Sequence, residues 1–198
     1  MNEITALNPK PKLCFTAGGM LVHEGKVMLV KHKKLGIWLG PGGHIDEDEY
    51  PHQAAEREFW EETGIKVRAI DPFTKVHESP ESEYFPSPVV SNLHWVCREN
   101  YDQRVASDDP SKRATNEIWQ RGCEQHMGFM YLVEAVDGLE FKQNTEETDG
   151  IGWFSADELD DLETIDDIRY EARRAIELAI ATQTWGLTIA FAVAKIYY

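Results

Sequence analysis

The sequence predicts one α/β domain in which strands lie on both sides of a loop and a helix. The chain has 198 residues, 42% of them hydrophobic, which is enough for a single globular core spanning residues 1–198. Two apolar, β-branched runs lie near the N-terminus with turn residues between them. A breaker-rich loop and a clearly bounded helix follow, and later runs return to the alternation that is typical of strands.

The chain is expected to open with a β-hairpin. Residues 15–22 and 26–31 are the two apolar runs, and three turn-forming residues separate them. Residues 35–43 contain four glycines and one proline, so we expect a loop there without regular structure.

The best-marked element is a helix between Pro51 and Thr63. Proline is favoured in the first turn of a helix, where its missing N–H leaves no hydrogen bond unmade. Gly64 follows the last helical position, and glycine readily adopts the left-handed conformation that ends helices.

Three more strands are expected beyond this helix, at residues 65–70, 89–96 and 129–136. The segment 98–122, between the last two strands, is mostly polar and charged. It lacks the apolar residues for a core of its own, so we interpret it as an insertion within the domain. Both a lid or binding loop and a mobile surface excursion fit this composition.

Two helices are expected near the C-terminus. Ser155 can cap the first, with Glu158 at the reciprocal position of a capping box. The second should cover residues 166–182, and an apolar tail follows it to residue 198. The apolar stripe of this last helix comprises Ile168, Ala172, Ala175, Ile176, Ala179 and Ile180.

Composition limits the partners of the chain. Its formal net charge of −15 repels phosphate backbones, so extended nucleic acid is not expected as a ligand. The first residues lack the basic and apolar runs of a secretory signal, and no run of about eighteen apolar residues occurs, so we expect a cytoplasmic protein without a membrane segment. The tail after Trp185 is too short to span a bilayer and favours packing or a homodimer.

The cysteines and histidines show no sequence pattern of a metal site. Cys14, Cys97 and Cys123 are odd in number and widely separated, so we expect reduced, mostly buried thiols without a functional role. The seven histidines are scattered without zinc-like partner spacing, and most are expected to be surface or packing residues.

Glu58, Glu61 and Glu62 share one face of the predicted helix. Like charges at this spacing destabilise a helix by only about 0.2–0.5 kcal/mol per pair, which solvent and Arg57 could offset. A solvated acidic helix is therefore one interpretation. The other is a site for a hard divalent cation, because Mg²⁺ and Mn²⁺ prefer oxygen ligands.

Residues 43–65 resemble the Nudix box, G(x5)E(x7)REUxEExGU, where U is apolar. A chance match to its seven fixed residues has a probability on the order of 10⁻⁸ per register. The resemblance to MutT-like Nudix hydrolases implies an α/β/α sandwich with a mixed sheet and a catalytic loop-helix-loop. One departure is Phe59, which is bulkier than the usual aliphatic residue. The box positions are Gly43, Glu49, Arg57, Glu58, Phe59, Glu61, Glu62, Gly64 and Ile65.

The resemblance also implies roles for individual residues. Glu58 and Glu62 would be the principal ligands of Mg²⁺, or of Mn²⁺ in its place, together with the backbone carbonyl of Gly42. Glu61 would be a further ligand or would orient the attacking water. Arg57 would orient the glutamates by pairing with Glu49 or Glu61.

A further acidic residue often precedes the Trp-Phe pair of related enzymes, which here is Trp153 and Phe154. Glu146 and Glu147 are the candidates for a base or metal ligand, and we favour Glu147. A solvated acidic loop is the alternative.

Such a site would hydrolyse the phosphoanhydride bond of a nucleoside diphosphate linked to another moiety. One alternative is a MutT-like (d)NTP pyrophosphohydrolase that acts on oxidised nucleotides. Another is a non-catalytic nucleotide-sensing module, which the intact glutamates of the box disfavour. The spacing of Pro80 from Gly64 resembles that of ADP-ribose pyrophosphatases, but the surrounding segment is rich in proline.

The substrate-binding candidates lie just before the box. Lys33 and Lys34 belong to a basic cluster that could face phosphates, although a solvated strand end fits as well. Trp38 could stack on a base, or it could simply pack against the fold.

Overall fold

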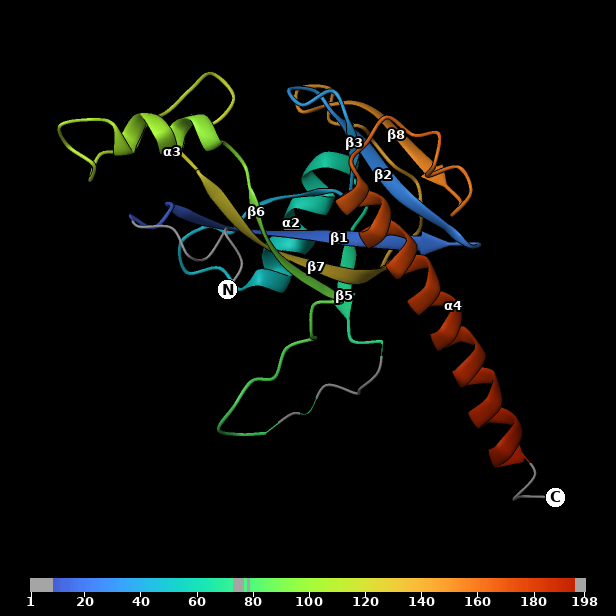
Figure 1. The fold of residues 1–198 in the computed structure, drawn as a ribbon. Helices are drawn as coiled ribbons and strands as arrows, with labels where there is room; N and C mark the ends of the chain where they lie inside the picture. The colour runs from blue at the N-terminus through green and yellow to red at the C-terminus, as the bar shows by residue number, and fades with distance from the viewer. Residues whose placement is uncertain (1–8, 73–76, 78, 195–198) are drawn as a thin grey trace.

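The computed structural model describes residues 9–72, 77 and 79–194, with only the backbone described from residue 183 onward (Figure 1). Residues 1–8, where no secretory signal was expected, and the last tail residues, 195–198, lie outside this part of the chain. The strands are β1 (Leu13–His23), β2 (Lys26–His32), β3 (Trp38–Leu39), β4 (Gly42–His44), β5 (Val67–Ile70), β6 (Val90–Trp95), β7 (Gln125–Ala135) and β8 (Thr148–Phe154). The helices are α2 (Pro51–Thr63), α3 (Arg98–Val105) and α4 (Asp166–Ala194).

The predicted hairpin is confirmed. β1 and β2 pair antiparallel, with His23 opposite Lys26, so only two residues form the turn. These are Glu24 and Gly25, whose φ angles of 49° and 75° are those of a type I′ turn.

A mixed sheet is built around β1. This strand pairs in parallel with β7, from Leu13 opposite Gln125 to Leu21 opposite Val133. The other edge of β7 carries β6 and then β5, both antiparallel. β4 pairs with β1, while β3 and β8 flank β2. The expected α/β sandwich with a mixed sheet is confirmed.

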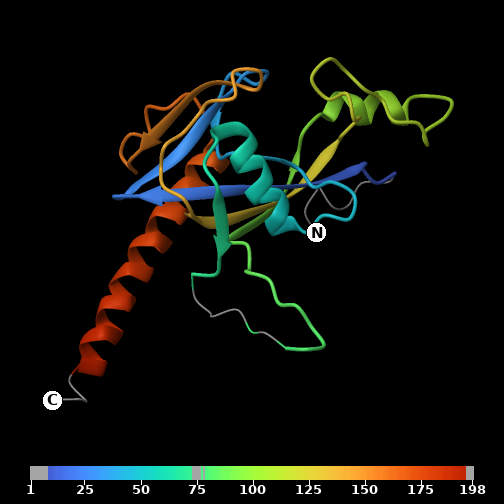
Figure 2. The ribbon, with the colours of Figure 1, turned by 180° about the vertical axis from the view of Figure 1, so that it is seen from behind.

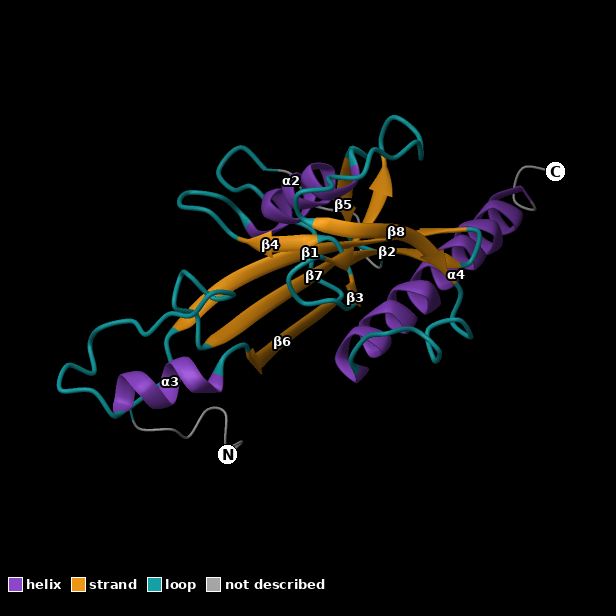
Figure 3. Cartoon of the chain, turned by 90° about the horizontal axis from the view of Figure 1, so that it is seen from above, coloured by secondary structure: helices purple, strands orange, loops and turns teal. Residues whose placement is uncertain are grey.

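Helices α2 and α4 cover opposite faces of the sheet, as Figures 2 and 3 show. Neighbouring residues of a strand point to opposite faces, so Leu21 and Val133 pack in the cluster that includes α2. Met20 and Leu132 pack in the second cluster, which includes α4.

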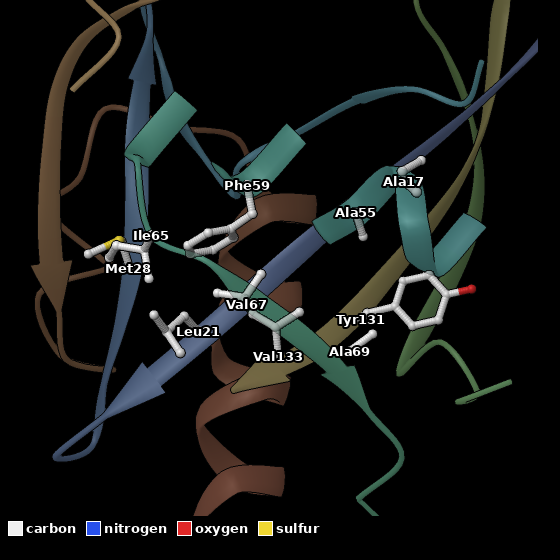
Figure 4. Packing of buried hydrophobic residues seen from close by; sticks show 11 residues of the cluster. Ala17, Leu21, Met28, Ala55, Phe59, Ile65, Val67, Ala69, Tyr131 and Val133 are labelled. Atoms are coloured by element: carbon white, nitrogen blue, oxygen red, sulfur yellow. The ribbon is translucent and has the colours of Figure 1, made fainter. Parts of the chain in front are cut away.

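The cluster under α2 accommodates the bulky residue of the box (Figure 4). Phe59 is fully buried there. A Cβ on Gly19 would lie 3.0 Å from the Phe59 ring, so the missing side chain of this glycine provides the space for the ring.

Helix α2 has the predicted ends. It begins at Pro51 and ends at Thr63, and Gly64 adopts a φ of 74°. The Gly64 N–H donates to the carbonyl of Trp60 at 2.7 Å, which satisfies one carbonyl of the last turn. The glutamates of the box therefore belong to a helix whose two ends are well defined.

The prediction of an irregular loop at residues 35–43 is wrong, because β3 and the start of β4 lie in it. The glycines permit close strand contact instead of disorder. A Cβ on Gly42 would lie 2.8 Å from the Cα of Gly18 on the neighbouring strand. Sequence reasoning also missed α3, a short helix within the 98–122 insertion that projects from the sheet in Figure 1.

The helix predicted to begin at Ser155 is also absent, and the segment 155–162 forms turns. The expected capping contacts are present, since Ser155 N–H donates to Glu158 at 2.7 Å. The carbonyls of Leu159 and Leu162 accept hydrogen bonds from the Arg169 side chain. These carbonyls are thus satisfied without a helix.

The last helix begins at Asp166 as predicted but runs to Ala194 rather than Thr182. Its stripe differs from the prediction at two positions, because Ile180 is 51% exposed whereas Leu178 is buried. No helix in the described part of the chain combines the length and apolar composition that a bilayer crossing needs.

Candidate active site

Four carboxylates lie close together in space, beside Gly42 and Gly43, where the box begins. Glu58, Glu61 and Glu62 come from α2, and Glu147 comes from the segment before β8. Burial raises the pKa of Glu62 to about 8, and the nearby charges of Glu58, Glu147 and Glu61 contribute to this increase. The pKa of Glu58 is raised by burial and by Glu61 and Glu147, against the opposing effect of Arg57. The structure therefore brings together all four acidic residues that the sequence pointed to.

Arg57 connects the helix to the loop before it. Its Nε and Nη2 donate to the two carboxylate oxygens of Glu49, both at 2.8 Å. Its Nη1 donates to Glu58 at 2.8 Å and to Glu61 at 3.1 Å. Its Nη2 also reaches the backbone carbonyl of His44 at 3.0 Å. Arg57 thus contacts both of its predicted partners and fixes two of the clustered glutamates.

Glu62 lacks such a partner. Its side chain is nearly inaccessible, with the residue 3% exposed, and it accepts a hydrogen bond from the Gly42 N–H at 3.2 Å. No ion pair to Glu62 occurs within the described residues. A buried carboxylate without a counter-ion is costly in its charged form, which is why its pKa is raised.

Gly43 leaves room for the carboxylate of Glu58. A Cβ built on Gly43 would lie 2.4 Å from two atoms of that carboxylate. The glycine of the box is therefore required for the close approach of loop and helix, not for a left-handed backbone.

The chemistry of this cluster fits a hard divalent cation. Carboxylate oxygens are the ligands that Mg²⁺ and Mn²⁺ prefer, and the uncompensated charge of Glu62 is the feature that a cation would balance. Glu58, Glu61 and Glu62 offer donors on one helix face, and the backbone of Gly42 borders them.

A cavity of about 270 Å³ begins at Gly42 and Gly43 and continues between β1, β4, β6, β7 and the start of α4. Its polar lining includes Asn92, whose Nδ2 donates to the buried carboxylate of Glu171 at 2.8 Å. Burial, together with the nearby charge of Asp167, raises the pKa of Glu171 to about 7.

Sequence reasoning missed these cavity residues. One signal was available for Glu171, which stands next to Ala172 on the predicted apolar stripe. Another was the alternation of Asn92 and His94, which places two polar side chains on the same face of a strand.

The predicted substrate-binding residues take different positions. The Lys33 ammonium donates to the carbonyl of Thr145 at 3.0 Å, and the Lys33 N–H donates to the carbonyl of Glu147 at 2.9 Å. Lys33 thus anchors the segment that carries Glu147, while Lys34 is exposed. The Trp38 ring packs edge-on against Phe154, with centroids 4.8 Å apart, and does not line the cavity. This placement favours the packing alternative for Trp38.

The structure brings together cysteines and histidines that lie far apart in the sequence. Four of them, Cys14, His44, Cys123 and His126, have side-chain ligand atoms that all lie within 4.8 Å of one another. We refer to these four residues as the Cys/His cluster. Residues far apart in sequence form it, so their spacing along the chain gave no sign of it. All three cysteines are free, as expected.

Known proteins resemble this chain in sequence and in fold. The profile of the NUDIX domain family matches residues 15–176. A MutT-like protein of Streptomyces ambofaciens is 34% identical over 135 residues, which are 68% of this chain and 82% of that protein. Phosphatase NudJ of Escherichia coli K12 is 41% identical over 61 residues, which are 29% of this chain and only 39% of NudJ. A NUDIX family hydrolase from Clostridium perfringens has the same fold, with a TM-score of 0.59, 22% identity, and coverage of 83% of this chain and 97% of that one.

Proposed function

This chain belongs to the NUDIX domain family of hydrolases, and from that premise we propose that it cleaves a nucleoside diphosphate linked to a second moiety, in a reaction that depends on Mg²⁺. The observation that carries the proposal is the buried, unpaired carboxylate of Glu62 among three other carboxylates. A fold retains such an arrangement at a cost in stability, which is expected where a cation and a phosphoanhydride are bound.

Glu58, Glu61, Glu62 and the backbone carbonyl of Gly42 would hold the ion. When bound, Mg²⁺ supplies charge neutralisation for the pyrophosphate oxygens and so favours attack on phosphorus. Arg57 would keep Glu58 and Glu61 in place through its hydrogen bonds, which makes it a positioning residue.

Glu147 would accept the proton of the attacking water at a carboxylate oxygen. Its backbone is held by Lys33, and its charge already acts on Glu58 and Glu62, so it lies close enough to the cluster for this role. The water oxygen would bond to one phosphorus as the bond from that phosphorus to the bridging oxygen breaks. The bridging oxygen would leave with the other phosphate, so that both products are phosphate esters.

The cavity of about 270 Å³ next to Gly42 and Gly43 would take the organic part of the substrate. Asn92 and Glu171 are hydrogen-bonded to each other in its wall and offer polar atoms to a base or sugar. Lys33 would contribute positive charge near the phosphates.

A second candidate is hydrolysis of nucleoside triphosphates, with oxidised nucleotides among the substrates. The similarity to the MutT-like protein of Streptomyces ambofaciens favours it. The two candidates differ in the products released, since a triphosphate yields a monophosphate and pyrophosphate.

The test is a substrate panel with Mg²⁺ or Mn²⁺ that includes ADP-ribose, nucleotide sugars, dinucleoside polyphosphates and (d)NTPs. We expect a nucleoside monophosphate from at least one of them, and none from the Glu62→Gln variant. Binding of a nucleotide without any turnover would instead indicate a sensing module and would refute hydrolysis.

A further inference from the structure

The Cys/His cluster forms where three strands and the end of the insertion meet. Cys14 on β1 stands directly beside His126 on the parallel strand β7. His44 ends β4 and stands opposite Thr16, two residues along β1 on the same face as Cys14. Cys123 follows Gly122, whose φ of 67° turns the chain back toward β7. Strand register therefore accounts for the convergence of residues from distant parts of the sequence.

We propose that the Cys/His cluster binds one zinc ion as a closed, four-ligand structural site. Two thiolates and two imidazoles are a ligand set typical of structural zinc. Zinc bonds of about 2.0–2.3 Å place tetrahedral ligand atoms about 3.3–3.8 Å apart. In the cluster, His44 Nε2 lies 3.2 Å from Cys123 Sγ, and no pair of ligand atoms is separated by more than 4.8 Å. The sulfurs of Cys14 and Cys123, now 2.7 Å apart, would move about 1 Å away from each other.

The surroundings of both imidazoles favour the neutral ring. Burial lowers the pKa of His126 to about 3, with smaller effects from His44 and His94. Burial also lowers the pKa of His44, with Arg121 contributing. Neutral rings keep a lone pair for coordination. The Nε2 atom of His126 is buried and has no hydrogen-bond partner, and a metal would instead engage its lone pair in a coordinate bond.

A redox or nucleophilic role fits the thiols less well. Reactive cysteines have lowered pKa values, whereas burial raises the pKa of Cys123 to about 12. A disulfide between Cys14 and Cys123 would use the two sulfurs but leave both imidazoles without a partner. Only coordination of a metal uses all four groups, and metal binding removes the thiol protons outright.

Positive charge surrounds the sulfurs. The Arg113 guanidinium donates to Cys14 Sγ at 3.4 Å and to the carbonyl of Arg121 at 2.7 Å. Both arginines favour the charged form of Cys123. Hydrogen bonds to coordinating atoms of this kind orient ligands and stabilise a metal–thiolate site.

The site would join the insertion to the active-site loop. Cys123 marks the end of the 98–122 insertion, and His44 directly follows Gly42 and Gly43. His44 and His126 also line the cavity. With four protein ligands the ion has no open position, so it would fix the cavity wall and take no part in the hydrolysis.

The experiment measures zinc in the full chain, purified without a chelating tag and dialysed against metal-free buffer. We expect about one zinc per chain, and at least about a 10-fold loss of bound zinc in Cys123→Ser and in His126→Gln. Cys97→Ser is the matched control. Cys97 is the buried cysteine outside the cluster, and serine can replace it as the cap of α3.

A second measurement guards against variants that fail to fold. Wild-type protein refilled with Co²⁺ should show the thiolate charge-transfer and tetrahedral d–d bands of a mixed sulfur and nitrogen site. Glu62→Gln should retain zinc, so the result does not depend on the proposed hydrolysis.

The proposal is overturned by any of three results. These are a wild-type chain that holds no zinc after incubation with excess Zn²⁺, a loss of zinc in Cys97→Ser equal to that in Cys123→Ser, or a protein purified without reductant whose mass shows a Cys14–Cys123 disulfide.

Discussion

Replacing Glu62 by glutamine should stabilise the Mg²⁺-free protein at neutral pH while abolishing turnover. The pKa of this carboxyl rises from 4.5 to about 8 on folding. Stability from a raised pKa is fully present below pH 4.5 and is lost as the pH rises toward 8. At roughly 1.4 kcal/mol per pH unit, holding Glu62 in the fold at pH 7 costs about 3 kcal/mol. Glutamine resembles the protonated carboxyl and can still accept the Gly42 hydrogen bond, so it avoids this cost.

The assay compares thermal and urea unfolding of both proteins at pH 5 and pH 7 without added divalent ions. The stability advantage of Glu62→Gln should grow from about 1 kcal/mol at pH 5 to about 3 kcal/mol at pH 7, where it corresponds to roughly 6–12 °C in Tm. Adding Mg²⁺ should stabilise wild type but not the variant. The exposed change Glu47→Gln serves as the control and should show no pH-dependent difference. A variant that is less stable than wild type by equal amounts at both pH values would refute the reasoning, because Glu62 would then stabilise the fold without an ion.

Three further substitutions test the carboxylate site of α2 and the ion pair that holds the insertion. Arg57→Lys removes the planar fork that holds Glu49 and Glu58, and should weaken Mg²⁺ affinity about 10–100-fold, measured by titration of activity with the ion. Gly43→Ala forces the Glu58 carboxylate to move and should lower kcat about 10-fold or more, with an unchanged circular dichroism spectrum; full activity would contradict the need for that space. Arg104→Ala leaves the buried Glu124 unpaired and should destabilise the fold by about 3–5 kcal/mol in urea unfolding, whereas Arg98→Ala, in an exposed pair, should cost less than about 1 kcal/mol.

Local sequence signals located most of the fold. Proline and glycine marked the two ends of α2, and apolar alternation located the hairpin and the later strands. These features depend on neighbouring residues, so the sequence carries them directly. The glutamates of α2 were found for the same reason, since a helix places residues three and four apart on one face.

Long-range pairing accounts for what was missed. Residues 35–43 form strands only because β1 and β2 lie beside them, which no local pattern reveals. The segment after Ser155 has a capping signal but is non-helical, and two of its carbonyls accept hydrogen bonds from Arg169 of α4. The Cys/His cluster depends on the register of β1 with β7, across more than a hundred residues of chain.

The parallel pairing of β1 with β7 also determines when the protein can fold. The first strand ends at His23, and its partner is complete only at Ala135. At a synthesis rate of about 5–20 residues per second, the nascent chain waits on the order of ten seconds before the central pair of the sheet can form. Residues of β1 that later become core, such as Met20 and Leu21, have no sheet partner in β7 during this interval. The β1–β2 hairpin therefore emerges without the strand that completes its sheet, and its apolar residues are accessible to a chaperone at the ribosome during that interval.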